Sequence, residues 1–254
     1  MNAPTVRFTD RVDDYIRYRP GYPDAVVAKL ESELGLVRER TRVVDLGTGT
    51  GISAELFLRA GYSVIGVEPN TAMRSAAERL LASYEHFRCV DGTAEATTLP
   101  DGAADLVVAA QAFHWFDRES ARREVHRILA PHGAVALMWN DRQLDSTPFL
   151  RGYEEALRRW ATDYTKVNHQ NLTHAEIASF FAPAECKLHV FANHQDFDWE
   201  GLLGRALSSS YVPTRGQPGH DEFVLRLHDL FSAHAVSERV RFEYDTKVYF
   251  GRFC

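Results

Sequence analysis

The glycine-rich stretch at residues 43–51 constrains the fold of this chain more than any other segment. It begins as the end of a buried strand, with two β-branched residues and a leucine, and continues into three alternating glycines. Glycines here allow a tight turn and a close approach of the backbone to a ligand. An apolar stripe before a further glycine predicts a short helix next, and this order is typical of the ligand-binding edge of an open α/β sheet. The residues are Val43, Val44, Leu46, Gly47, Thr48, Gly49 and Gly51, followed by Ile52, Leu56, Ala60 and Gly61.

Asp45 narrows the kind of ligand that this turn could hold. It lies two residues before Gly47, at the expected mouth of the strand. A dinucleotide would bring its pyrophosphate to the turn, where a carboxylate repels it. S-adenosylmethionine has no phosphate and carries a sulfonium and an amino group, so an acid is tolerated or useful there. The alternative is a turn whose glycines only permit tight packing, with Asp45 capping a loop.

The composition is that of an ordinary globular protein. With 254 residues, of which 45% are hydrophobic and 25% charged, we expect a single domain over residues 1–254. The net charge of −6 argues against a nucleic-acid-binding surface, and no apolar run is long enough to span a membrane. The first twenty residues are polar and arginine-rich, unlike a signal peptide. Because Cys89, Cys186 and Cys254 are widely spaced, we expect reduced thiols, no metal site and a cytoplasmic location.

Hydrophobic periodicity predicts seven strands and the helices that flank them. The strands are expected at residues 43–46, 62–67, 86–90, 104–110, 134–139, 186–191 and 240–250. Helices are expected at residues 8–18, 24–34, 52–60, 70–81 with Asn70 as its cap, from 118 to a stop at 131–133, at 147–161, after 174, and at 199–210 and 221–235. Glu68 follows the second strand, 21 positions after Gly47, a spacing typical of an acid that binds a ribose diol.

Four motifs, in the expected order, resemble the class I S-adenosylmethionine-dependent methyltransferases. The glycine turn with Asp45 resembles motif I of that family, and Glu68 lies at the position that binds the ribose. Residues 93–95 resemble the adenine-recognition segment, and residues 111–115 resemble the border of the methionine portion. The resemblance covers about residues 41–140. It implies an α/β fold: a Rossmann-like seven-stranded mixed sheet flanked by helices, with the last strand antiparallel and extra helices at the N-terminus and between strands six and seven.

The resemblance also implies S-adenosyl-L-methionine as cofactor and S-adenosyl-L-homocysteine as product. It divides the chain into N-terminal lid helices at residues 1–40, a cofactor-binding core at 41–140, and a C-terminal sheet half with helical substrate-side additions at 141–254. Thr93 lies where many relatives carry an acid, so Asp91 or Glu95 could take over recognition of the adenine amine. The implied cofactor-binding residues are Asp45, Gly47, Thr48, Gly49, Gly51, Glu68, Pro69, Met73, Thr93, Ala94, Glu95, Ala110 and Gln111.

Residues 18–23 and 111–116 resemble a small-molecule branch of the family that includes the trans-aconitate methyltransferases. On this basis we predict that Tyr18, Arg19, His114 and Trp115 lie on the substrate side, with His114 as the candidate catalytic base. Arg19 is a forked donor that could pair with an acidic acceptor. The alternatives are that the aromatic residues simply pack and that Arg19 is a surface residue beside a turn.

The predicted function is therefore methyl transfer by in-line displacement to a small-molecule acceptor, for which a carboxylic acid is one candidate. Two other functions remain open. One is an NAD-dependent oxidoreductase, against which Asp45 and the two-residue spacing from Gly49 to Gly51 count. The other is a non-catalytic S-adenosylmethionine-binding regulatory protein. The sequence contains no hydrolase elbow, no phosphate loop ending in Gly-Lys-Ser/Thr and no paired metal-binding histidines, and it specifies neither the acceptor nor the oligomeric state.

Overall fold

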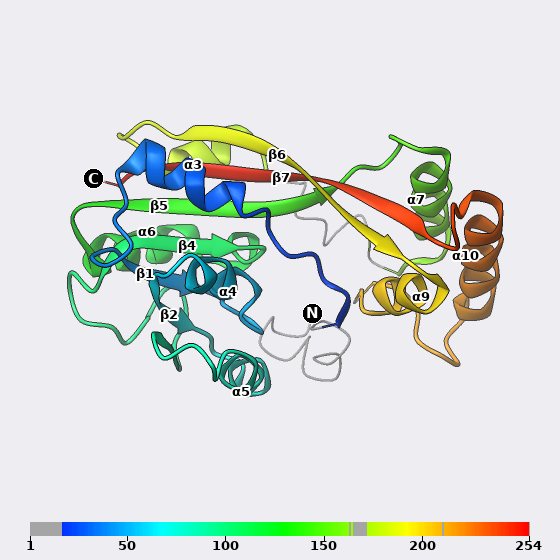
Figure 1. The fold of residues 1–254 in the computed structure, drawn as a ribbon, viewed down its shortest axis with the longest axis horizontal. Coiled ribbons are helices and arrows are strands. Elements are labelled where there is room, and N and C mark those ends of the chain that lie inside the picture. The colour runs from blue at the N-terminus through cyan, green and yellow to red at the C-terminus, as the bar shows by residue number, and fades with distance from the viewer. Residues whose placement is uncertain (1–16, 163, 165–171, 210, 254) are drawn as a thin grey trace.

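A computed structural model describes residues 17–162, 164, 172–209 and 211–253 of the chain. Its centre is a seven-stranded sheet with the strand order β3-β2-β1-β4-β5-β7-β6 (Figure 1). Strands β1 to β5 pair in parallel, whereas β7 pairs antiparallel with both β5 and β6. The predicted mixed sheet with an antiparallel last strand is therefore confirmed. The elements are α3 Ala25–Leu34, β1 Arg42–Leu46, α4 Ile52–Arg59, β2 Ser63–Val67, α5 Thr71–Leu80, β3 Phe87–Val90, β4 Ala104–Ala110, the 3₁₀ turn η2 Phe113–Trp115, α6 Arg118–Ile128, β5 Leu129–Arg142, α7 Pro148–Trp160, α8 His174–Phe181, β6 Lys187–Phe197, α9 Trp199–Leu207, α10 His220–His234 and β7 Val240–Arg252.

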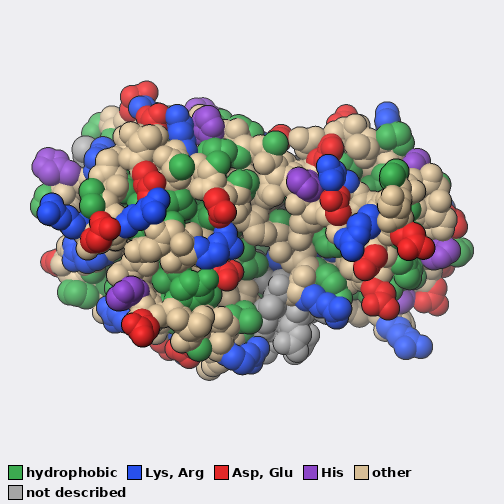
Figure 2. Space-filling view, in the orientation of Figure 1, with side chains coloured by type: hydrophobic (Ala, Val, Ile, Leu, Met, Phe, Trp, Pro, Cys, Tyr) green, Lys and Arg blue, Asp and Glu red, His purple; other side chains and the backbone are tan. Residues whose placement is uncertain are grey.

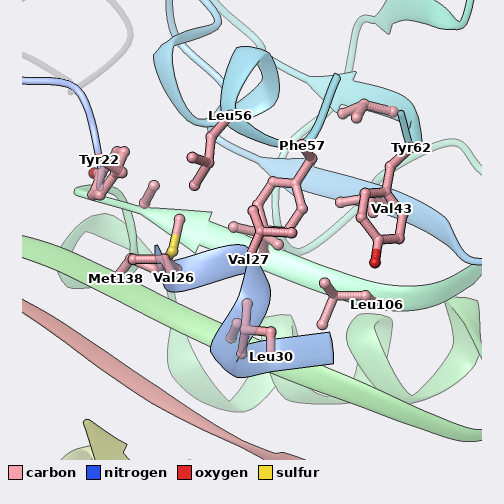
Figure 3. Packing of buried hydrophobic residues seen from close by; sticks show 14 of the residues in the cluster. Tyr22, Val26, Val27, Leu30, Val43, Leu56, Phe57, Tyr62, Leu106 and Met138 are labelled. Carbon is pink, nitrogen blue, oxygen red and sulfur yellow. The ribbon is translucent and has the colours of Figure 1, made fainter. Parts of the chain in front are cut away.

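Alternation of side chains along the central strands gives the sheet two apolar faces. Val43 and Leu106 point to one face, where they pack against helices α3 and α4 (Figure 3). Val44 and Val107 point to the opposite face, which is covered by α6 and α8. Because strands β1 and β4 are buried on both faces, their sequences are almost continuous apolar runs.

Two strands are longer than their sequence predicts. The predicted stop at residues 131–133 does not separate α6 from β5, because β5 begins directly after the helix at Leu129. The pairing of β4 with β5 shifts between Ala104 and Leu106, so the proline–glycine stretch is accommodated as an irregularity within the strand. Strand β6 was expected to end at residue 191 and instead continues to Phe197, since β7 offers it a pairing partner along that whole length.

The long strands β6 and β7 carry a second group of helices. The last residue of β5 to pair with β7 is Arg142, opposite Tyr244, and beyond this point β6 and β7 continue alone as a two-stranded ribbon. Helices α7, α9 and α10 gather around this ribbon at the end of the molecule toward which β4 points (Figure 1). They share a separate apolar cluster that includes Tyr153 and Phe242. We call this part the helical lobe and the remainder the sheet lobe.

The molecular surface narrows between the two lobes (Figure 2). On the face shown, acidic and basic side chains are interspersed over both lobes, with no large area of a single charge. Within the described ranges, no helix has both the length and the apolar character needed to cross a membrane. The predicted helix at residues 8–18 lies outside the described residues, except for Arg17 and Tyr18.

Candidate functional site

The glycine turn between β1 and α4 has the backbone geometry that its sequence predicts. Gly47, Gly49 and Gly51 all have positive φ angles, of 67°, 56° and 93°. A Cβ atom on Gly47 would lie 2.7 Å from the Cβ of Ala112, and one on Gly51 would lie 2.6 Å from Leu81. A Cβ on Gly49 would meet no atom within 4 Å. The outer two glycines therefore permit close packing, while Gly49 borders open space where a ligand could approach the backbone.

Asp45 supports this turn from inside the protein. Its side chain is fully buried on the α4 face of the sheet, and its Oδ2 accepts hydrogen bonds of 2.7 Å from the hydroxyls of Thr48 and Ser53. Its Oδ1 is buried and has no hydrogen-bond partner among the described residues. Burial raises the pKa of Asp45 to about 6, although the two hydroxyl groups oppose this shift. Asp45 is therefore more deeply placed than the strand mouth that the sequence suggests, and one of its acceptor atoms is not used by the surrounding protein.

Glu68 connects the glycine turn to the next βα unit. Its Oε2 accepts a 2.9 Å hydrogen bond from the backbone N–H of Gly49, and its Oε1 accepts one of the same length from Asn70. Asn70 caps helix α5 through a hydrogen bond from the Met73 N–H, as predicted. Burial raises the pKa of Glu68, and the two backbone donors oppose that rise. Since each carboxylate oxygen can accept more than one hydrogen bond, Glu68 can hold the turn and still accept from a ligand.

The carboxyl end of β4 lies next to the same turn. Ala110 ends the strand, and Gln111 then adopts a positive φ of 55°, which is unusual for a residue with a side chain. The Gln111 N–H donates to the Met138 carbonyl, and its side-chain amide donates to the Asn140 carbonyl at 3.2 Å. These bonds hold the end of β4 against β5. The distorted backbone thus occurs where a functional residue was predicted.

The aromatic run after Gln111 divides into packing and accessible residues. Phe113 is buried and makes edge-to-face contacts with Phe116, Trp139 and Phe180, so for Phe113 the packing alternative is correct. His114 is half-buried, and its ring lies 4.8 Å from the ring of Trp115, centroid to centroid. Trp115 is 36% exposed. Neither His114 nor Trp115 belongs to the hydrophobic clusters of the core.

The predicted adenine segment forms a tight turn after β3. Thr93 and Ala96 pair as an isolated bridge, and Ala94 is buried in the sheet core. The carboxylate of Glu95 accepts a hydrogen bond from the N–H of Asp117, the residue that caps α6, so one of its oxygens already has a partner within the protein. Of the other predicted neighbours, Met73 is buried on α5 and Pro69 is half-buried at the end of β2. Contact of this segment with an adenine ring remains a prediction.

Residues 18–22 cross from the sheet lobe to the helical lobe, and we call them the strap. The Asn140 side chain, at the end of β5, donates to the carbonyls of Pro20 and Gly21 at 3.4 and 3.1 Å. Asn193 on β6 donates to the Gly21 carbonyl at 2.9 Å and to the Asn140 oxygen at 3.2 Å. Thr246 on β7 donates to the same Asn140 oxygen at 2.5 Å. Residues of three strands thus hold the strap in place.

The N-terminal end of the strap reaches helix α9. The Arg19 guanidinium donates to the Ser208 carbonyl at 3.5 Å. A Cβ on Gly204 would lie 2.2 Å from the ring of Tyr18, so that ring rests directly on the α9 backbone. Asn140, Asn193 and Gly204 were not among the predicted site residues, because each lies far in sequence from the residues that it contacts. A glycine beside leucines in a predicted helix was the only available signal.

The described part of the chain contains no cluster of three or more potential metal-ligating side chains. Cys89 and Cys186 are free thiols, and Cys254 lies outside the described residues.

A family model matches part of this chain. Residues 44–137 match the model described as a methyltransferase domain. This part of the chain is therefore similar to a methyltransferase domain. The matched range runs from β1 to β5 and so includes the glycine turn, Glu68, the segment after β3 and the end of β4.

Relatives of known sequence agree with this assignment over part of their length. An uncharacterised methyltransferase-like protein of Schizosaccharomyces pombe is 32% identical over 157 residues, which are 61% of this chain and 59% of that protein. An uncharacterised methyltransferase of Mycobacterium bovis is 36% identical over 138 residues, 54% of each chain. The chain thus matches only about half to three-fifths of the length of these relatives.

Solved structures share the fold over nearly the whole chain. A protein of Anaeromyxobacter dehalogenans, provisionally named a type II methyltransferase, superimposes with a TM-score of 0.68 at 22% identity, covering 92% of this chain and 98% of that one. A geranyl diphosphate methyltransferase solved in complex with S-adenosylmethionine gives a TM-score of 0.52 at 14% identity, covering 91% and 85%. At these identities the likeness shows the fold alone. The predicted Rossmann-like methyltransferase fold is confirmed.

The residues of the site suit S-adenosylmethionine chemically. The buried Oδ1 of Asp45 needs a donor, which an ammonium group or a water bound to it can supply. The open space at Gly49 lies beside the Glu68 carboxylate, a suitable acceptor for a vicinal diol. Two buried acids beside the turn disfavour a pyrophosphate at this place and favour a ligand of positive charge.

Proposed function

We propose that this chain is an S-adenosylmethionine-dependent methyltransferase that acts on a small-molecule acceptor by in-line displacement. The observation that carries the proposal is the bond from the Gly49 N–H to Glu68, which places a buried acid at the open side of the glycine turn. The match of residues 44–137 to a methyltransferase domain supports the same function. S-adenosylmethionine supplies, when bound, a methyl group on a positively charged sulfur.

The residues of the chain bind and align the two reactants. Glu68 accepts from the ribose hydroxyls, and Asp45 provides a negative environment for the positively charged methionine portion. Thr93 and Ala94 border the adenine. Alignment and exclusion of water by the protein are the main sources of rate enhancement in a displacement of this kind. The strap and the helical lobe supply the second side of the cleft.

His114 is the candidate base for an acceptor that must lose a proton, such as a phenol or an amine. It lies in the 3₁₀ turn that follows β4, half-buried beside Trp115. A carboxylate acceptor is already a nucleophile at neutral pH and needs no base. In that case Arg19, which lies on the strap, pairs with the carboxylate of the acceptor. The resemblance of residues 18–23 and 111–116 to the small-molecule branch that includes the trans-aconitate methyltransferases supports this second possibility. The location that we propose for the protein is the cytoplasm.

Methyl transfer from a labelled cofactor to a panel of carboxylic acids, phenols and amines tests the function. We expect labelled product and S-adenosylhomocysteine in equal amounts with at least one acceptor. Binding of S-adenosylhomocysteine without transfer to any acceptor would favour the regulatory function instead. For a phenol or amine, His114→Gln should lower kcat and remove the acidic limb of the pH profile. An unchanged pH profile in that variant would eliminate His114 as the base.

A further inference from the structure

Helix α9 of the helical lobe carries a buried arginine that the proposed cofactor site does not use. The side chain of Arg205 is only 7% exposed. Its Nη1 donates to the Ser209 hydroxyl at 3.2 Å, and its guanidinium lies among Tyr153, Tyr211 and Tyr244. Its Nε is buried without any hydrogen-bond partner among the described residues. The guanidinium therefore retains donor capacity that the surrounding protein does not satisfy.

A second buried arginine, Arg142 at the end of β5, extends its side chain into the helical lobe and has its charge balanced there. Arg142 donates to the Glu154 carboxylate at 2.6 Å and to the Tyr164 hydroxyl at 3.1 Å, and its guanidinium lies 4.9 Å from the centre of the Tyr153 ring. Both members of this ion pair are about 90% buried. No carboxylate of the described residues lies within ion-pair distance of Arg205. A buried cation without a counter-charge is costly, and an anionic ligand would remove that cost.

A series of polar contacts leads from the surroundings of Arg205 to the strap and on to the end of β4. The Tyr244 hydroxyl donates to Gln195 on β6 at 3.0 Å, and the Gln195 amide donates to the Tyr18 carbonyl on the strap at 3.4 Å. The preceding residue, Gly204, supports the Tyr18 ring. The strap is in turn held by Asn140, whose carbonyl binds Gln111 at the end of β4. The strap therefore links the end of β4 to helix α9 of the helical lobe.

We propose that Arg205 binds an anionic group, a carboxylate or a phosphate, on the acceptor molecule. A guanidinium whose Nε–H is unsatisfied can donate a charge-assisted hydrogen bond to either oxyanion. The hydroxyls of Tyr153 and Tyr211 are further candidate donors, and the tyrosine rings around the guanidinium exclude water. That the anion belongs to a methyl acceptor rests on the proposed function, whereas the anion site itself does not.

Thermal denaturation and calorimetry with simple probes test this site without any turnover. The probes are a series of dicarboxylates from malonate to adipate, their neutral diamides, and inorganic phosphate, each with and without S-adenosylhomocysteine. We expect at least one anion, and no diamide, to raise the Tm of the wild type. The carboxylate and phosphate arms identify which oxyanion the site prefers.

Variants of the arginine provide the decisive comparison. Arg205→Met should weaken anion binding about 10- to 100-fold, and Arg205→Lys should retain part of it. Because the buried charge has no carboxylate partner in the ligand-free protein, Arg205→Met should melt at the same temperature as the wild type or higher. Arg158→Met is the matched control, since Arg158 is on the same lobe but its side chain is 66% exposed. That variant should bind anions as the wild type does.

Two results would overturn the proposal: no anion stabilises the wild type, or Arg205→Met responds to anions as the wild type does. A large loss of Tm in ligand-free Arg205→Met, with anion binding unchanged in Arg205→Lys, would identify a structural arginine. Failure of S-adenosylhomocysteine to bind, with anion binding at Arg205 intact, would refute the proposed function and leave the anion site standing.

Discussion

The two lobes differ in the sign of the buried charges that have no ion-pair partner among the described residues. Beside the glycine turn the sheet lobe buries two such acids, Asp45 and Glu68, while the helical lobe buries the Arg142–Glu154 ion pair and, without a carboxylate partner, Arg205. Hydrogen-bond donors of the glycine turn and of α4 stabilise the acids, whereas one arginine has an internal carboxylate and the other has none among the described residues. The comparison suggests a division of labour, in which the sheet lobe favours a cationic methyl donor and the helical lobe favours an anionic acceptor.

The largest expected effect is the loss of the satisfied arginine. Arg142→Met leaves the Glu154 carboxylate buried beside Tyr164 without its closest cation. Removal of one partner from a buried ion pair typically costs about 3–5 kcal/mol of unfolding free energy. Denaturant unfolding measures this change in unfolding free energy. Arg205→Met is the comparison, and its unfolding free energy should not fall. Equal destabilisation by the two variants would mean that Arg205, like Arg142, is stabilised by partners within the ligand-free protein.

The next effect concerns the pH dependence of stability in the sheet lobe. The pKa of Asp45 rises from 3.8 to about 6 on folding, chiefly through burial. A raised pKa contributes stability that is complete below about pH 4 and is lost as the pH rises through 6. Roughly 2 pKa units correspond to about 3 kcal/mol. Asp45→Asn should therefore gain about that much relative to the wild type between pH 4 and pH 7, while its affinity for S-adenosylhomocysteine falls.

Asp105 offers a matched control with the opposite sign. It lies on the neighbouring strand β4 and pairs with Arg42 at 3.0 Å. Burial would raise its pKa, but the hydrogen bonds from Arg42 outweigh burial and leave the pKa below its ordinary value. Its contribution to stability is present above the unfolded pKa and is lost as the pH falls, so Asp105→Asn should lose stability near neutral pH. If both variants followed the same pH trend, the burial of Asp45 would not explain its pKa.

The smallest of the three effects is on cofactor affinity. Glu68→Gln replaces one of the two carboxylate oxygens by an NH2 group, which cannot accept a hydrogen bond. One of the two bonds, from the Gly49 N–H or from the Asn70 N–H, is therefore lost. We expect S-adenosylhomocysteine to bind about tenfold more weakly, the loss of roughly one charge-assisted hydrogen bond. Calorimetry measures this change. The exposed Glu78→Gln on α5 should leave the affinity unaltered, and a similar loss in both variants would indicate a general charge effect.

The sequence predicted the short strands and the helices of both lobes better than the long extensions of β5 and β6, for a physical reason. Buried parallel strands, glycine turns and helix caps are encoded within a few neighbouring residues, so β4 and the Asn70 cap were predicted to the residue. The extension of β6 to Phe197 depends on pairing with distant β7, and the bulge that absorbs residues 131–133 depends on β4. Local patterns do not encode such contacts.

The residues of the site also divide into those that local sequence patterns predict and those that they do not. Glu68, Gly49 and Gln111 could be selected from motifs and spacing, and the structure brings them to one edge of the sheet. Asn140 and Arg205 could not, because an asparagine after a strand and an arginine within a helix are ordinary surface residues by pattern. Only their burial and their partners in three dimensions point to a function.

The central claim is that the glycine turn binds a sulfur nucleoside without phosphates. Calorimetry of the wild-type protein with S-adenosylhomocysteine and with NAD tests it most directly, because the two ligands share the adenosine and differ in the group attached to its 5′ carbon. The account predicts a saturable heat of binding for S-adenosylhomocysteine that weakens in Glu68→Gln, and none for NAD. Saturable binding of NAD, with no binding of S-adenosylhomocysteine, would contradict it.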